Sequence, residues 1–100
     1  MRDHERRAET RIRPEAVRIE FPDLQPRLRD LSPSGAYIED PHPLPRGRMV
    51  RMQIWLSKDV GITVRAMSRW VNEGAGMGME FLEISDADRA RLRNFIAAAP

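Results

Sequence analysis

Apolar and polar residues alternate along six short runs of this sequence, and turn-forming residues separate the runs. In the first run, Val17, Ile19 and Phe21 alternate with charged residues. This period of two is typical of β-strands that bury one face. We therefore predict strands over residues 16–21, 25–32, 35–39, 48–56, 61–71 and 75–82. The methionines of these runs, Met49, Met52, Met67, Met77 and Met79, are predicted to fill the core, because thioethers adapt to irregular packing.

The last part of the sequence follows a helical period instead. Ser85 suits an N-cap, and Asp88 three residues later completes a pattern similar to a capping box. Leu92 and Ile96 then fall on one apolar stripe, opposite several arginines. We predict a helix over residues 85–98. It would cover one opening or edge of an antiparallel barrel or sandwich that the strands build.

One hundred residues are enough for a single domain and too few for a separate catalytic one. Residues 1–14 are polar and rich in arginine, and they end at a proline. We expect them to form a flexible tail that no apolar side chain holds in place. Residues 15–83 are expected to form the β-structure and residues 85–98 the helix of one domain that spans residues 1–100.

The charge balance and the composition exclude several classes of protein. Lysine and arginine total 17 against 15 acidic residues, a net charge of +2, whereas a general nucleic-acid binder usually carries a marked basic excess. The sequence has no cysteine, which suits a reducing cytoplasm. It has neither an apolar signal segment nor an apolar run long enough for a membrane span. We expect a cytoplasmic protein that does not bind DNA or RNA and does not insert into membranes.

The sequence also lacks the marks of an enzyme. His4 lies in the predicted tail and His42 in a proline-rich loop, so neither stands on a firm element beside a partner. No metal-ligand spacing, phosphate-binding loop or pair of catalytic carboxylates stands out. We predict that the chain is not an enzyme and holds no metal ion.

Asp30, Ser32 and Gly35 surround the predicted turn between the second and third strands. Pro33 fixes φ there, and glycine tolerates the positive φ that some tight turns need. In an extended strand Asp30 and Ser32 share one face of the sheet. They either offer a carboxylate and a hydroxyl to a ligand or cap the turn by bonding its backbone N–H groups.

Two motifs combine with this pattern of strands and helix. Arg6, Arg7 and Arg11 form an Arg-Arg-x-x-x-Arg motif in the tail, and an Asp-x-Ser-x-x-Gly motif begins at Asp30. Together with the Val-x-Ile-x-Phe first strand, the Gly-Met-Gly-Met-Glu-Phe run and the closing helix, they make nearly the whole chain resemble the PilZ domain family. The resemblance implies a six-stranded antiparallel β-barrel with a C-terminal α-helix. It also implies that the two motifs bind the bacterial second messenger cyclic di-GMP.

The resemblance implies ligand-binding roles for Arg6, Arg7, Arg11, Asp30, Ser32 and Gly35. Arginine matches phosphate oxygens and the O6/N7 edge of guanine. In the family, an arginine placed as Arg6 is here often accompanies binding of a stacked ligand dimer. Trp70 is a further candidate that either stacks on a base or sugar or fills the core, since its parity matches that of Ile62 and Val64.

The expected function is therefore that of a receptor for cyclic di-GMP, with no further cofactor. Ligand binding would order the tail and change a surface that a downstream protein partner recognises. One alternative is a PilZ-like protein-interaction module that does not bind nucleotide. Another is a small barrel that binds single-stranded nucleic acid, which the small number of aromatic residues disfavours.

Overall fold

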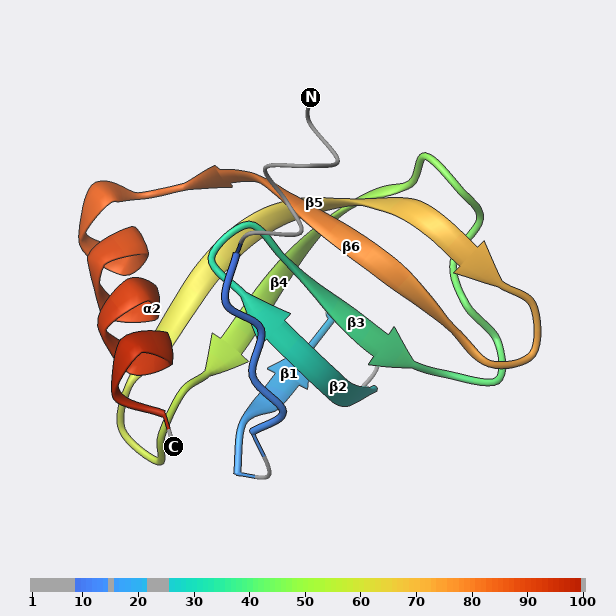
Figure 1. Ribbon diagram of the computed structural model, residues 1–100. Helices are drawn as coiled ribbons and strands as arrows, with labels where there is room; N and C mark the ends of the chain where they lie inside the picture. The colour runs from blue at the N-terminus through green and yellow to red at the C-terminus, as the bar shows by residue number, and fades with distance from the viewer. Residues whose placement is uncertain (1–8, 15, 22–25, 100) are drawn as a thin grey trace.

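The computed structural model describes residues 9–14, 16–21 and 26–99. Their β-strands are β1 (Arg18–Glu20), β2 (Arg27–Ser32), β3 (Gly35–Glu39), β4 (Met49–Trp55), β5 (Gly61–Asn72) and β6 (Gly76–Ile84), and the C-terminal helix is α2 (Asp86–Ala98). All neighbouring strands are antiparallel, in the order β1-β4-β5-β6-β3-β2. The sheet curls into a nearly closed barrel (Figure 1), which confirms the predicted fold class.

The alternation in the sequence becomes the inner and outer faces of this barrel. On β4 and β5 the inward residues pair across the strands, with Met52 opposite Val64 and Ile54 opposite Ile62. All four of these side chains are buried. Each buried aliphatic side chain stabilises the fold by about 1.5–3 kcal/mol, so the inner face supplies most of the driving force for folding.

Two of the five methionines that were predicted to fill the core lie on the outer face of the barrel instead. Met52, Met77 and Met79 are buried as predicted, but Met49 is 40% exposed and Met67 is only partly buried. Met49 and Met67 face each other across β4 and β5 on the outer face of the barrel. The prediction that they fill the core is wrong, because their parity along the strands places them outside.

The hairpin between β2 and β3 is closed by Ser32 opposite Gly35. Gly35 does not have a positive φ; among the described glycines only Gly47 and Gly74 do. A Cβ at Gly35 would instead lie 2.4 Å from the backbone oxygen of Met79 on β6. The glycine is therefore required by the close approach of β6, and not by the turn conformation.

Trp70 does not belong to the core. The buried residues of β5 alternate regularly up to Ser68, and the register with β6 then shifts by one residue between Ser68 and Trp70. This bulge moves Trp70 to the outer face, where it is 53% exposed. The alternative that Trp70 fills the core is therefore wrong.

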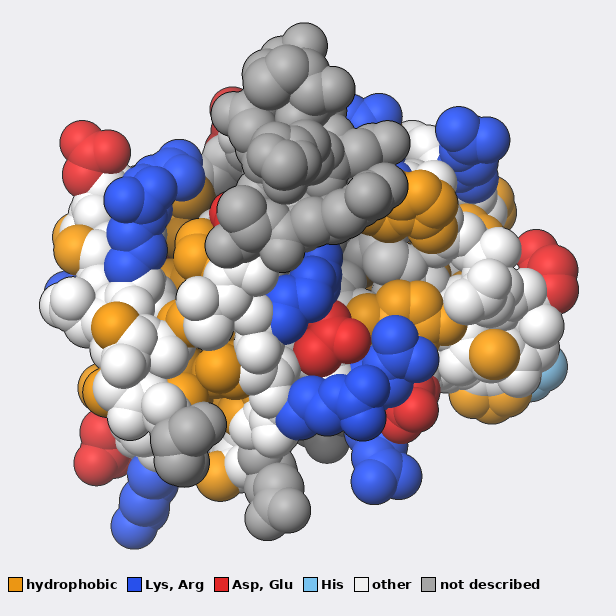
Figure 2. All heavy atoms as spheres, viewed as in Figure 1, with side chains coloured by type: hydrophobic (Ala, Val, Ile, Leu, Met, Phe, Trp, Pro, Cys, Tyr) orange, Lys and Arg blue, Asp and Glu red, His pale blue; other side chains and the backbone are white. Residues whose placement is uncertain are grey.

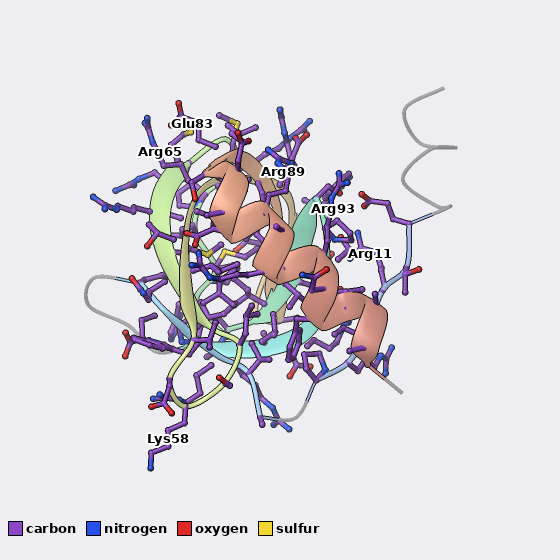
Figure 3. The ribbon with its side chains drawn as sticks, turned by 90° about the vertical axis from the view of Figure 1, so that its left-hand side faces the viewer. Arg11, Lys58, Arg65, Glu83, Arg89 and Arg93 are labelled. Atoms are coloured by element: carbon purple, nitrogen blue, oxygen red, sulfur yellow. The ribbon has the colours of Figure 1, made fainter. Side chains whose placement is uncertain are left out.

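Helix α2 lies across one mouth of the barrel (Figures 1 and 3). It begins as predicted, because the Ser85 hydroxyl accepts a hydrogen bond of 3.1 Å from the backbone N–H of Asp88. The Asp88 carboxylate accepts a second bond of 3.1 Å from the backbone N–H of Thr63, which attaches the helix to β5. Leu92 and Ile96 of α2 are buried and belong to the core of the barrel. No described helix is long and apolar enough to cross a membrane.

Replacing Leu92 by alanine should destabilise the protein by about 2–5 kcal/mol, since it leaves a cavity between α2 and the barrel. Urea unfolding followed by circular dichroism measures this loss. Arg93→Ala, on the exposed side of the same helix, serves as the control and should change stability by less than about 0.5 kcal/mol. Equal stability of the two variants would mean that α2 is not part of the cooperative fold.

Candidate functional site

The segment that precedes β1 is docked on β2. Ile12 and Leu31 exchange two backbone hydrogen bonds of 2.9 Å, and the Ile12 side chain packs against the core. The Ser34 hydroxyl donates a further hydrogen bond to the Glu9 carboxylate. The expectation that no apolar side chain holds residues 1–14 is therefore wrong for the described part of this segment. Arg6 and Arg7 lie outside the described residues.

The docked segment brings Arg11 to Asp30. Arg11 Nη1 donates to Asp30 Oδ1 at 2.9 Å, and Arg29 Nε donates to Asp30 Oδ2 at 3.3 Å. Asp30 is buried, and a buried carboxylate needs such charged partners. Each oxygen of Asp30 is thus held by a guanidinium group, which differs from the turn-capping alternative.

Ser32 bonds the backbone of the turn, but through a carbonyl and not through the N–H groups that the turn-capping alternative named. Its side chain is fully buried, and its hydroxyl donates to the backbone carbonyl of Gly35 at 3.3 Å. Ser32 and Gly35 together fix the end of the hairpin, and with it the position of Asp30 two residues earlier. In this structure Ser32 and Gly35 therefore position Asp30 by fixing the hairpin that carries it.

Two aromatic side chains stand beside Asp30 on the outer face. Asp30 pairs with Tyr37 across β2 and β3, Tyr37 pairs with Gly78 across β3 and β6, and Trp70 pairs with Gly78 across β5 and β6. These residues therefore form one row across four strands. Because Gly78 has no side chain, the Trp70 ring can lie over it; a Cβ there would be 2.8 Å from Trp70 Cε3.

Two neighbouring side chains hold the Tyr37 side chain in place. The guanidinium carbon of Arg29 lies 3.9 Å from the centre of the ring, a cation–π contact. The Tyr37 hydroxyl accepts a hydrogen bond of 2.7 Å from the Asn72 amide. Arg29 thus contacts both Tyr37 and Asp30, and it connects the aromatic and the acidic parts of the row.

These residues surround one hollow of about 240 Å³. Arg11 and Arg29 line it together with all four members of the row, Asp30, Tyr37, Gly78 and Trp70. On this face positive side chains gather around acidic ones, with hydrophobic side chains next to them (Figure 2). Larger hollows, of about 740 and 730 Å³, contain neither Asp30 nor Trp70, so volume alone does not identify the site.

The hollow suits a flat, anionic ligand. Its guanidinium groups can bind phosphate or the edge of a base, its carboxylate can accept from ring N–H groups, and its aromatic rings can stack. Among the described residues, no group of acidic, histidine or cysteine side chains could hold a metal ion.

The sequence prediction named Arg11, Asp30 and Trp70, which this hollow brings together, but it missed Arg29, Tyr37 and Gly78. The outward parity of Tyr37 along residues 35–39 was an available signal, since an aromatic residue on an outer face beside a charged motif is unusual. The contact between Arg29 and Tyr37 had no such signal, because it depends on the register of two strands.

Comparisons with known proteins agree with this architecture. The family model described as PilZ domain matches residues 2–98. Among solved structures, the Bacillus subtilis inhibitor of motility, MotI/DgrA, is similar with a TM-score of 0.75 and 20% identity. That match covers 90% of this chain and 49% of the other, so this chain spans about half of its length.

An uncharacterized Legionella protein is similar with a TM-score of 0.64 and 10% identity, over 87% of this chain and 89% of the other. At such identities the two structures show the fold alone. No protein of curated function matches the sequence significantly.

If the bare backbone at Gly78 positions Trp70, then Gly78→Ala should push the indole off the sheet. In a Trp55→Phe background all tryptophan fluorescence comes from Trp70, because the chain has two tryptophans. We expect its emission to move to longer wavelength and acrylamide quenching to increase. Unchanged emission and quenching in a folded Gly78→Ala variant would contradict the positioning role of this glycine.

Proposed function

Because this chain belongs to the PilZ domain family, we propose that it is a receptor for cyclic di-GMP and that the ligand binds at the hollow beside Asp30. The observation that carries the proposal is the convergence of Arg11, Asp30 and Trp70, from separate parts of the sequence, on one hollow. These residues supply the cation, the carboxylate and the ring that a guanine nucleotide requires.

The chemistry of the ligand matches the residues in the hollow. Cyclic di-GMP has two phosphodiester groups and two guanine bases. Arg11 and Arg29 would bind phosphate oxygens or the O6/N7 edge of a guanine. Asp30 would accept from guanine N1–H and N2–H, and the rings of Tyr37 and Trp70 would stack on the ligand.

The size of the hollow limits how the ligand would sit. Pockets that enclose drug-sized molecules measure about 300–1,000 Å³, and this hollow measures about 240 Å³. It would therefore take one base, with the rest of the dinucleotide over its rim. We assign the phosphates on that rim to Arg6, Arg7 and Arg11 by their shared motif, with Arg6 available for a second ligand molecule.

The signal would pass through the segment that carries these arginines. Phosphate groups would neutralise Arg6, Arg7 and Arg11 and hold the segment more firmly against the barrel than the contacts of Ile12 with β2 already do. That rearrangement would change the surface around the segment, and a downstream protein partner would recognise the change.

A second candidate is an interaction module that does not bind nucleotide. The pairing of Arg11 with Asp30, together with the bond from Ser32 to Gly35, satisfies the motif residues within the protein itself. In that case the ion pair would serve only to fix the segment on β2.

Calorimetric titration with cyclic di-GMP, with GTP and cyclic GMP as controls, separates the two candidates. We expect selective binding of cyclic di-GMP, and its stoichiometry counts the ligand molecules. Arg11→Ala should weaken binding about 10- to 100-fold, since it removes a charge-assisted contact. Arg93→Ala, on the exposed side of α2, should change the affinity less than about twofold. Absence of binding by the folded wild type would favour the interaction module.

Amide hydrogen exchange tests whether the ligand passes its signal through the segment that carries these arginines. At saturating cyclic di-GMP, exchange over residues 2–13 should slow, because the ligand would hold the segment in place. Exchange in α2 serves as the internal control and should not change. Binding that leaves exchange over residues 2–13 unaltered would contradict the relay while leaving the receptor function in place.

A further inference from the structure

A second charged hollow lies at the N-terminal end of α2, away from the residues assigned to nucleotide. It measures about 620 Å³, and Arg51 on β4, Arg65 on β5 and Arg89 on α2 line it. Figure 3 shows Arg65 and Glu83 together near the start of α2, with Arg89 on the helix beside them. Three elements therefore bring arginines to one place.

Two of these arginines are direct neighbours across the sheet. Arg51 and Arg65 occupy opposite positions in the register of β4 and β5, and both are exposed on the outer face. Like charges directly opposite each other destabilise a sheet. Arg65 is compensated by Glu83, whose Oε1 accepts from Arg65 Nη1 at 2.7 Å. Among the described residues, the guanidinium groups of Arg51 and Arg89 have no hydrogen-bond or ion-pair partner.

The nearest remaining acid is already engaged. Asp88 also lines the hollow, but Oδ2 accepts from the backbone N–H of Thr63 at 3.1 Å and Oδ1 accepts from Arg91 at 2.8 Å. Asp88 thus attaches the helix to β5 and does not neutralise Arg51. The hollow keeps two uncompensated cations, Arg51 and Arg89, which the stability of the fold does not explain.

Apolar side chains accompany these cations. Leu82 is 38% exposed and Ile84 is partly buried, and both line the hollow. We propose that this surface docks a segment of a partner protein in which acidic residues flank a leucine or a residue of similar size. The carboxylates would pair with Arg51 and Arg89, and the apolar side chain would cover Leu82. This interface would form whether or not the chain binds a nucleotide.

The composition of the hollow favours a protein partner over a nucleic acid. Glu83 and Asp88 stand among the arginines and would repel a continuous row of phosphates, whereas a peptide can place its carboxylates individually. Surfaces that bind nucleic acid also usually carry a marked basic excess, and the net charge of this chain is +2.

The test uses the full chain and the acetylated, amidated peptide Glu-Glu-Leu-Leu-Glu-Glu as the probe, with Lys-Lys-Leu-Leu-Lys-Lys as its charge-reversed control. Backbone amide shifts in NMR locate the binding, and their titration gives the affinity. We expect the acidic peptide to shift the resonances of residues 51, 65, 82 and 89 and to bind about tenfold more tightly than the basic one.

Charge reversal on the protein separates a defined site from general attraction. Arg51→Glu should weaken binding of the acidic peptide about tenfold. The same variant places a carboxylate opposite Arg65, so its melting temperature should rise by about 1–4 °C, which excludes misfolding as the cause. Arg46→Glu changes the net charge equally at an exposed loop residue outside the hollow, and it should weaken binding less than about twofold.

Each other outcome overturns the proposal. An equal loss of peptide affinity in Arg51→Glu and Arg46→Glu would mean that the peptide responds only to the overall charge of the protein. Absence of amide shifts at residues 51, 65, 82 and 89 would mean that this surface does not bind acidic segments. An oligothymidylate that binds the same residues more tightly than the peptide would identify a nucleic-acid surface. Self-association in sedimentation that Arg51→Glu abolishes would identify a second copy of the chain as the occupant.

Discussion

The pairing of β3 with β6 holds the two parts of the barrel together, and the arrangement of the site depends on it. It joins the β2–β3 hairpin to the sheet formed by β1, β4, β5 and β6. The pairing is possible because two glycines, Gly35 and Gly76, leave room where a Cβ would lie 2.4 Å from a backbone oxygen of the opposite strand. Without this close approach, Asp30 and Tyr37 would not stand beside Trp70, and no hollow would exist between them.

Charge is distributed differently in the two arginine-lined hollows. At Asp30, two arginines converge on one buried carboxylate, so the cations are satisfied and positioned before any ligand arrives. Such preorganisation lowers the cost of binding, because the side chains are already ordered. At the N-terminal end of α2, the exposed guanidinium groups of Arg51 and Arg89 have no partner among the described residues. The first arrangement favours geometric selectivity and the second favours fast electrostatic encounter.

Much of this fold could be predicted from local patterns. Alternation located the six strands, and Ser85 with Asp88 located the start of α2, because strand faces and helix caps depend on neighbouring residues. The outward face of Trp70 could not be predicted, since a bulge between Ser68 and Trp70 reverses the parity. The docking of Ile12 on Leu31 was also missed, because one apolar residue in a charged segment gives no periodic signal.

The candidate site could be predicted only in part, because some of its contacts join residues that are far apart in the sequence. The motifs pointed to Arg11 and Asp30, and the structure places these side chains in contact. The contact of Arg29 with Tyr37 and the opposition of Arg51 and Arg65 depend on which residues face each other across strands. Register is set by the whole barrel, and local sequence windows do not contain it.

The two backbone hydrogen bonds between Ile12 and Leu31 also protect the protein against aggregation, because they cover part of an open strand edge. In the order of the sheet, β2 is a terminal strand, and unpaired N–H and C=O groups on such a strand invite pairing with another chain. Ile12 occupies part of that edge and packs its side chain against the core beneath it. The segment that carries Arg11 therefore also shields the edge of the barrel, so any event that lifts the segment would expose a template for aggregation.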